Sequence, residues 1–125
     1  MPEHSFKDCR ILVVEDEYLI ADDLCSVLME AGAQVLGPVP NVEDANSIIA
    51  AEQRIDCALL DINLNGMMVF DIADTLVARE VPFIFATGYD QWAIPERFAH
   101  VPRLEKPIKG RQMFAALLPL INVDS

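Results

Sequence analysis

The chain has 125 residues, a formal net charge of −11 and 53% hydrophobic residues. This length corresponds to one domain, and the hydrophobic content supplies a core and excludes a disordered chain. The acidic balance repels nucleic acid and anionic membranes, and no apolar stretch approaches the roughly 20 residues that span a bilayer. Because the start also lacks the basic and apolar regions of a signal peptide, we expect a cytoplasmic protein without nucleic-acid or membrane partners.

Three cysteines, Cys9, Cys25 and Cys57, show no metal-ligand spacing. Each lies in an apolar run, and their odd number argues against a disulfide framework. We therefore predict three buried, reduced thiols.

Short apolar runs alternate with amphipathic stretches along the whole chain. In chain order we predict strand 9–14, helix 18–31, strand 34–36, helix 42–53, strand 56–60, helix 67–79, strand 83–86, strand 103–105 and helix 109–118. Gly37-Pro38 closes the second strand, and Pro119 ends or bends the last helix. Residues 88–102 are the least regular part, where Pro95 permits only a short helix around 90–98.

This alternation predicts an α/β protein with a parallel sheet covered on both faces. Right-handed crossovers favour a flavodoxin-like, doubly wound sheet of five strands in the order 2-1-3-4-5, with a short or irregular fourth helix. In such sheets, ligands bind outside the carboxyl ends of the strands, where the strand order reverses. The residues that follow the strands are therefore the candidate site.

Polar residues stand at the ends of four predicted strands. They are Glu15 and Asp16 after the first strand, Asp61 after the third, Thr87 after the fourth and Lys106 after the fifth. Converging carboxylates repel one another unless a cation is present. Mg²⁺ suits this set because it takes oxygen ligands, and the backbone carbonyl of Asn63 could supply another.

The same set suits phosphoryl transfer to a carboxylate. Asp61 can act as a nucleophile toward phosphorus and form an aspartyl phosphate. Such transfer depends on positioning and charge neutralisation. Lys106, the Thr87 hydroxyl and Mg²⁺ would each contact one phosphoryl oxygen.

Four segments carry a resemblance to a known family. They are Ile11-Leu12-Val13-Val14-Glu15-Asp16-Glu17, Ala58-Leu59-Leu60-Asp61-Ile62-Asn63-Leu64, Phe85-Ala86-Thr87-Gly88 and Lys106-Pro107. With them the chain resembles the receiver domains of two-component response regulators, the CheY-like family. The resemblance covers residues 7–121, so we expect a single receiver domain over 1–125.

The resemblance implies a role for each residue of the set. Asp61 would accept a phosphoryl group from a histidine kinase. Asp16, Asp61 and the Asn63 carbonyl would ligate Mg²⁺, with Glu15 assisting through water. Thr87 would be the switch hydroxyl and Lys106 the phosphate-binding lysine, aimed by a cis bond to the following proline.

The chain departs from the family pattern in two places. Most receivers carry a proline four residues after the phosphoacceptor and a glycine eight after, whereas Asn65 and Gly66 stand four and five residues after Asp61. Arg103 stands where the family usually has an aromatic switch residue. We therefore predict that residues 88–102 reorder when Thr87 moves toward phosphate.

The segment Phe85-Ala86-Thr87-Gly88-Tyr89-Asp90 also resembles the FATGUY receivers of alphaproteobacteria, but it departs from their motif by one position, because Tyr89 directly follows Gly88. Members of that subgroup are often single-domain receivers, and several work with HWE-type histidine kinases. The resemblance implies a phosphoacceptor that does not turn over a substrate. Because the sequence shows no evident coiled coil or large apolar stripe, we expect a monomer. Its output would be protein contact with an effector, or transfer of the phosphoryl group to a histidine of another protein.

Two alternatives remain open at this point. The first is a Mg²⁺-dependent phosphohydrolase with an aspartate nucleophile, like the haloacid-dehalogenase-like phosphatases. Those usually place Asp-x-Asp after the first strand and add a cap domain, neither of which this sequence offers. The second is an interaction domain that keeps the fold without phosphorylation.

Overall fold

The computed structural model describes residues 6–88 and 94–121, which form a five-stranded parallel sheet between two layers of helices. The sheet strands are β1 (Arg10–Val14), β2 (Gln34–Val39), β3 (Cys57–Asp61), β6 (Phe83–Thr87) and β7 (Arg103–Glu105). The α-helices are α1 (Tyr18–Glu30), α2 (Val42–Ala51), α3 (Phe70–Ala78) and α4 (Gly110–Ile121). A 3₁₀ helix, η1 (Glu96–Phe98), and a hairpin of β4 (Asn63–Leu64) and β5 (Met67–Met68) complete the described elements.

The sheet order is β2-β1-β3-β6-β7, with every neighbouring pair parallel. The flavodoxin-like fold and the predicted order 2-1-3-4-5 are confirmed. The predicted fourth and fifth strands are β6 and β7, because the labels β4 and β5 belong to the two hairpin strands. The order reverses between β1 and β3, so the ligand-binding edge lies at their carboxyl ends.

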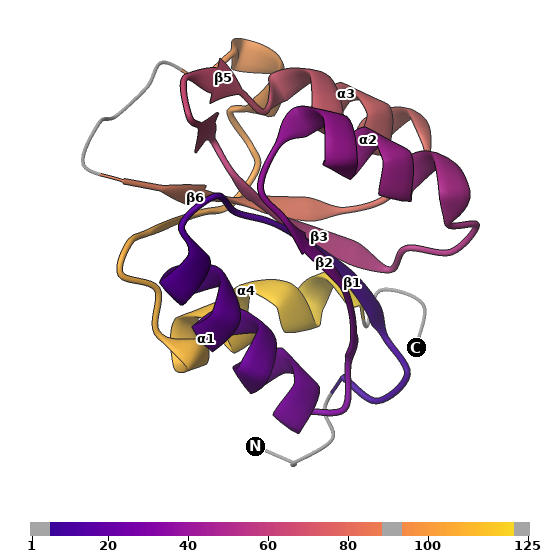
Figure 1. The fold of residues 1–125 in the computed structure, drawn as a ribbon, viewed down its shortest axis with the longest axis vertical. Coiled ribbons are helices and arrows are strands. Elements are labelled where there is room, and N and C mark those ends of the chain that lie inside the picture. Colours follow the sequence, from indigo (N-terminus) through magenta and orange to yellow (C-terminus); the bar gives the residue numbers. More distant parts are fainter. Residues whose placement is uncertain (1–5, 89–93, 122–125) are drawn as a thin grey trace.

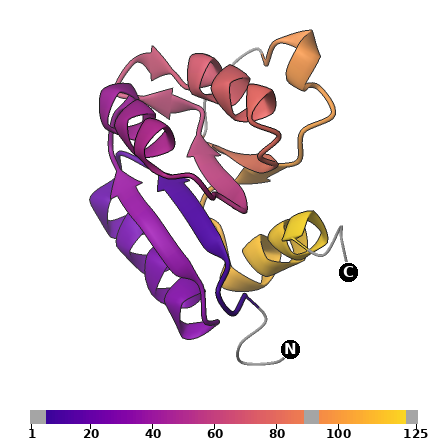
Figure 2. The same cartoon turned by 90° about the vertical axis from the view of Figure 1, so that its right-hand side faces the viewer.

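Helices α2 and α3 cover one face of the sheet, and α1 and α4 cover the other (Figures 1 and 2). Strand residues divide between these layers by alternation. Leu12 and Leu60 pack in the cluster that contains the α2 and α3 residues, whereas Val13 and Leu59 pack in the cluster with α1 and α4. All four are at most 1% exposed. Burial on both faces explains why these strands read as continuous apolar runs.

An aromatic cluster covers the sheet where the connection between β6 and β7 crosses it. Phe98, on η1, is 2% exposed, and its ring centroid lies 5.8 Å from that of Phe85 and 6.0 Å from that of Phe83. Phe70, at the start of α3, lies 6.0 Å from both Phe85 and Phe98. Phe98 thus packs this connection onto the core, together with the buried Val101 that follows η1.

The third helix was predicted to begin at residue 67, and this is wrong. The chain first forms the β4–β5 hairpin, and α3 begins at Phe70. Asn65 and Gly66 have φ angles of 52° and 90°, which turn the chain back on itself. The apolar residues from Met67 to Val69 therefore belong to the hairpin and its exit.

Several other predicted boundaries also change. Strand β2 continues through Gly37-Pro38 to Val39, which an edge strand tolerates because one side needs no ladder hydrogen bonds. Helix α4 continues past Pro119 to Ile121. The proline removes one hydrogen bond only two residues before the helix ends, and Ala115, whose carbonyl it frees, is exposed.

Two further predictions have mixed outcomes. The short helix expected at 90–98 falls partly outside the described residues, and the described part is η1 alone. Cys25 and Cys57 are buried as predicted, but Cys9, just before β1, is only half-buried. Burial raises the pKa of Cys25 to about 11 and that of Cys57 to about 12, so these thiols are protonated at neutral pH.

No helix in the described ranges has the length and apolar character of a membrane span.

Candidate functional site

The register of the sheet brings the residues that follow the strands to one edge. Val14 pairs with Leu60, so Glu15 follows beside Asp61. Asp61 pairs with Ala86, which places Thr87 one residue further along. Thr87 in turn pairs with Glu105, and its carbonyl accepts a hydrogen bond of 2.8 Å from the Lys106 amide. The parallel strands thus bring these residues together, because each residue lies at a strand end or directly after it.

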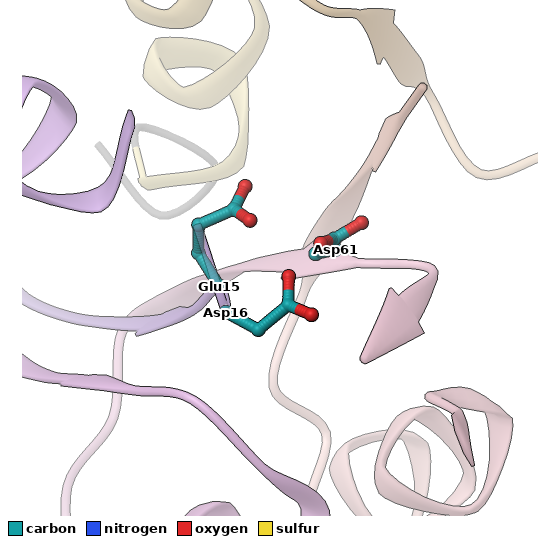
Figure 3. Close-up of side chains that lie close together, drawn as sticks. All are labelled: Glu15, Asp16 and Asp61. Atoms are coloured by element: carbon teal, nitrogen blue, oxygen red, sulfur yellow. The ribbon is translucent and has the colours of Figure 1, made fainter. Parts of the chain in front are cut away.

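Three carboxylates converge at this edge (Figure 3). One oxygen from each of Glu15, Asp16 and Asp61 lies within 4.8 Å of the others. Glu15 and Asp61 are both 4% exposed, and Asp16 is half-buried. Buried acids at this spacing need a compensating cation.

The Lys106 ammonium provides one positive charge to this cluster. Its Nζ lies 2.9 Å from Glu15 Oε1 and 3.1 Å from Asp61 Oδ2. It also lies 3.1 Å from Glu17 Oε1, a contact that the sequence analysis did not predict. The acid run Glu15-Asp16-Glu17 was the sequence signal for such a contact. Which of these acids contacts Lys106 depends on how the chain turns from β1 into α1.

The environment raises the pKa of two of these groups. Burial, together with the hydrogen bond and negative charge of Glu15, raises the pKa of Asp61 to about 8 despite the opposing effect of Lys106. Burial disfavours charge on Lys106, but its hydrogen bonds and charge interactions with Glu15, Asp61 and Glu17 outweigh burial and raise its pKa. One cation therefore does not fully compensate the acids.

The donor set fits a divalent cation. Glu15 Oε1 is buried and, within the described part of the chain, has no hydrogen-bond partner of good geometry, although it lies near the Lys106 ammonium. The cluster offers three carboxylates and no nitrogen or sulfur ligand, which matches the preference of Mg²⁺ for oxygen. The residues that would hold Mg²⁺ are Asp16 and Asp61, with Glu15 beside them and the Asn63 carbonyl two residues past Asp61.

The hairpin after β3 lies against this cluster. The Asn63 amide donates to Asp61 Oδ1 over 3.4 Å, and the Asn65 amide donates to Asp16 Oδ2 over 2.9 Å. The second contact joins residues 49 positions apart. The sequence analysis noted the unusual turn but did not predict that its tip contacts a metal-ligand candidate.

The two remaining residues of interest lie on the last two strands of the sheet, one at the end of β6 and one at the start of β7. Thr87 ends β6 and is half-buried, so the register places it next to the cluster. Arg103 begins β7 and is exposed. An exposed arginine at this position does not replace an inward aromatic side chain. The peptide bond between Lys106 and Pro107 is cis, as the resemblance implied.

Comparison with known proteins identifies the class. A sequence model of the response regulator receiver domain matches residues 11–117, and the chain belongs to this family. The chain is 35% identical over 88 residues to the sensory transduction protein LytT of Bacillus subtilis, covering 68% of this chain and 36% of LytT. It is 39% identical over 91 residues to the phyllosphere-induced regulator PhyR of Methylorubrum extorquens, covering 71% of this chain and 32% of PhyR.

A solved structure agrees with this assignment over a larger share of both chains. The solution structure of SdrG from Sphingomonas melonis Fr1 is similar with a TM-score of 0.81 and 36% identity, covering 91% of this chain and 97% of SdrG. The BeF₃-activated conformation of SdrG is also similar, with a TM-score of 0.73 and 34% identity. In contrast, the chain spans only about a third of the length of LytT and PhyR. The chain is therefore a response regulator receiver domain.

Proposed function

We propose that Asp61 is the phosphoacceptor of this receiver. A carboxylate oxygen of Asp61 attacks the phosphorus of a phosphohistidine on a histidine kinase, the P–N bond breaks, and an acyl phosphate forms. Lys106 neutralises charge on the transferred group, and the Thr87 hydroxyl donates to it. Asp16, Asp61 and the Asn63 carbonyl, with Glu15 assisting, would hold a Mg²⁺ ion, which would supply further positive charge to the phosphoryl oxygens. The observation that carries the proposal is the buried Asp61, which lies 3.1 Å from Lys106 and within the three-carboxylate cluster.

Intact-mass analysis after treatment with acetyl phosphate tests this proposal. We expect one phosphoryl adduct per chain with Mg²⁺, and none with a chelator or in Asp61→Asn. Continuous release of phosphate from a small ester would instead favour the phosphohydrolase. No adduct with acetyl phosphate or with a phosphorylated kinase would favour an interaction domain that works without phosphorylation.

The partner class can be proposed more narrowly. Similarity to PhyR and SdrG, together with the Phe85-Ala86-Thr87-Gly88 segment, supports placement in the FATGUY subgroup and phosphorylation by an HWE-type histidine kinase. Transfer from purified, autophosphorylated kinases of the HWE type and of an unrelated type, measured as initial rates, tests this. Comparable rates from both would contradict the subgroup assignment.

The output is proposed to be protein contact in the cytoplasm, or onward transfer to a histidine of another protein. Residues 1–125 would act as one monomeric receiver domain, and the match to nearly all of SdrG supports a receiver of this extent. Size-exclusion chromatography with and without BeF₃⁻ and Mg²⁺ tests the oligomeric state. A dimer in either state would contradict a monomeric receiver.

The signal is proposed to leave Asp61 through Thr87 and the connection from β6 to β7. Phe85, two residues before Thr87, packs against Phe98 of that connection, which links the strand end to η1. Amide exchange at 94–102, with and without BeF₃⁻ and Mg²⁺, tests this route. Equal protection in both states would contradict it.

A further inference from the structure

The tip of the β4–β5 hairpin has a backbone geometry that few residues adopt. Asn65 and Gly66 both have positive φ angles, of 52° and 90°, as in the tight turns that join two antiparallel strands. The Asn63 side chain accepts a 2.7 Å hydrogen bond from the Gly66 amide and closes the turn. Leu64, only 2% exposed, anchors the hairpin in the core. The tip is thus held in a defined position above the sheet edge.

This position directs a backbone N–H at a carboxylate of the site. The Asn65 amide lies 2.9 Å from Asp16 Oδ2, an ordinary length for an N–H donor and a charged acceptor. The Asp16 side chain lies beside Asp61, and both belong to the three-carboxylate cluster (Figure 3). A donor on one oxygen restricts rotation of the carboxylate and partly offsets repulsion from its neighbours.

We infer that Asn65 is a positioning residue, whose backbone N–H orients Asp16 to bind Mg²⁺. The inference rests on the proposed function, because it takes Asp16 as a ligand of the metal. Partners that hydrogen-bond to a metal ligand fix its orientation, and their loss typically costs about 10–100-fold in metal affinity. The hairpin therefore contributes to metal affinity without supplying this ligand itself.

The residue type at position 65 matches this role. A proline there would have no N–H to donate and could not adopt a positive φ. Most other side chains disfavour a positive φ, whereas asparagine and glycine tolerate it. Asparagine at 65 thus provides the donor and the backbone conformation that aims it.

An amide-to-ester exchange removes the donor alone. The α-hydroxy analogue of asparagine, placed at position 65 by semisynthesis, replaces the N–H with an oxygen and keeps the side chain. The matched control is glycolic acid at position 66, which removes the Gly66 N–H that closes the turn through Asn63. The readout is the Mg²⁺ dissociation constant from an NMR chemical-shift titration, with thermal midpoints measured without metal.

We expect the ester at 65 to weaken Mg²⁺ binding about tenfold or more. The Asn65→Gly variant, which keeps the donor, should stay within about threefold of the unmodified protein, and the ester at 66 should weaken Mg²⁺ binding less than the ester at 65, while both esters lower the metal-free midpoint. Equal dissociation constants for the unmodified protein and the ester at 65 would overturn the positioning role alone. Failure of the unmodified protein to bind Mg²⁺ would overturn both this inference and the metal site proposed for the function.

Discussion

Two of the connections that leave the ligand-binding edge of the sheet are held in different ways. Residues 62–69, between β3 and α3, form a hairpin whose amides donate to Asp61 and Asp16. In the connection from β6 to β7, the described residues are held by burial of Phe98 and Val101 and by an exposed ion pair between Arg97 and Asp74. Hydrogen bonds thus fix the tip of the first connection to the site, with Leu64 buried beneath it, whereas apolar packing is the main contact that holds the described part of the second.

The difference separates two tasks. Hydrogen bonds from the hairpin act directly on the carboxylates, so changes there should alter metal binding. Among its described residues, the second connection packs on β6 through Phe98, so changes there should alter stability and signal output while metal binding stays constant. Variants in each connection should therefore separate the two tasks.

The largest effect is expected at the aromatic cluster. Phe98→Ala removes a buried ring that packs against Phe83 and Phe85, and should lower the unfolding free energy by about 3–5 kcal/mol. The Mg²⁺ dissociation constant should not change. Urea unfolding measures the first quantity, with Tyr18→Ala as control because Tyr18 is 78% exposed. A loss below about 1 kcal/mol would show that this ring does not hold the connection.

Mg²⁺ should stabilise the folded chain through the carboxylate cluster. At a concentration 100 times its dissociation constant, a ligand of the folded state adds about 2.7 kcal/mol. Asp16→Ala should abolish most of this gain, whereas Asp23→Ala, at an exposed acid on α1, should keep it. Urea unfolding with Mg²⁺ or with a chelator provides the comparison. Equal gains in the two variants would place the metal elsewhere.

Asp61→Asn should stabilise the metal-free protein increasingly as pH rises. The folded pKa of Asp61 is raised from 3.8 to about 8, so its neutral form is favoured in the folded state. The wild type therefore loses stability between about pH 4 and pH 8 as the unfolded state gives up this proton first. Asparagine cannot ionise. The unfolding free energy of the variant should therefore exceed that of the wild type by on the order of 2 kcal/mol at pH 8 and by less at pH 5. Unfolding in a chelator at both pH values measures this gap, and a constant gap would contradict the shift.

The smallest effect is expected at the exposed ion pair of the second connection. Arg97 Nε lies 2.9 Å from Asp74 Oδ1, and both side chains are about half exposed. Arg97→Ala should cost at most about 1 kcal/mol, because solvent screens such pairs. Urea unfolding measures the cost. A loss above about 2 kcal/mol would show that polar contacts hold this connection as well.

The two connections also show how far the sequence predicts the structure. Strands were predictable because burial on both faces leaves continuous apolar runs, and the polar residues after them were predictable because parallel strands end at one edge. The turn at Asn65-Gly66 carried a local signal, because this dipeptide favours the tight turns of hairpins. The two-residue strands and the contact with Asp16 were missed, because they depend on packing of Leu64 and on a residue distant in sequence. Phe98 gave no local signal, since one phenylalanine in an irregular segment acquires its role only through packing against β6.

The central claim is that Asp61 carries the phosphoryl group. Borohydride reduces an aspartyl phosphate to homoserine, so peptide mass mapping after phosphorylation with Mg²⁺ and reduction locates the acceptor directly. We predict homoserine at position 61 and unmodified residues at Glu15 and Asp16. Homoserine at position 16, or an unmodified Asp61 in a chain whose intact mass shows the adduct, would contradict the account.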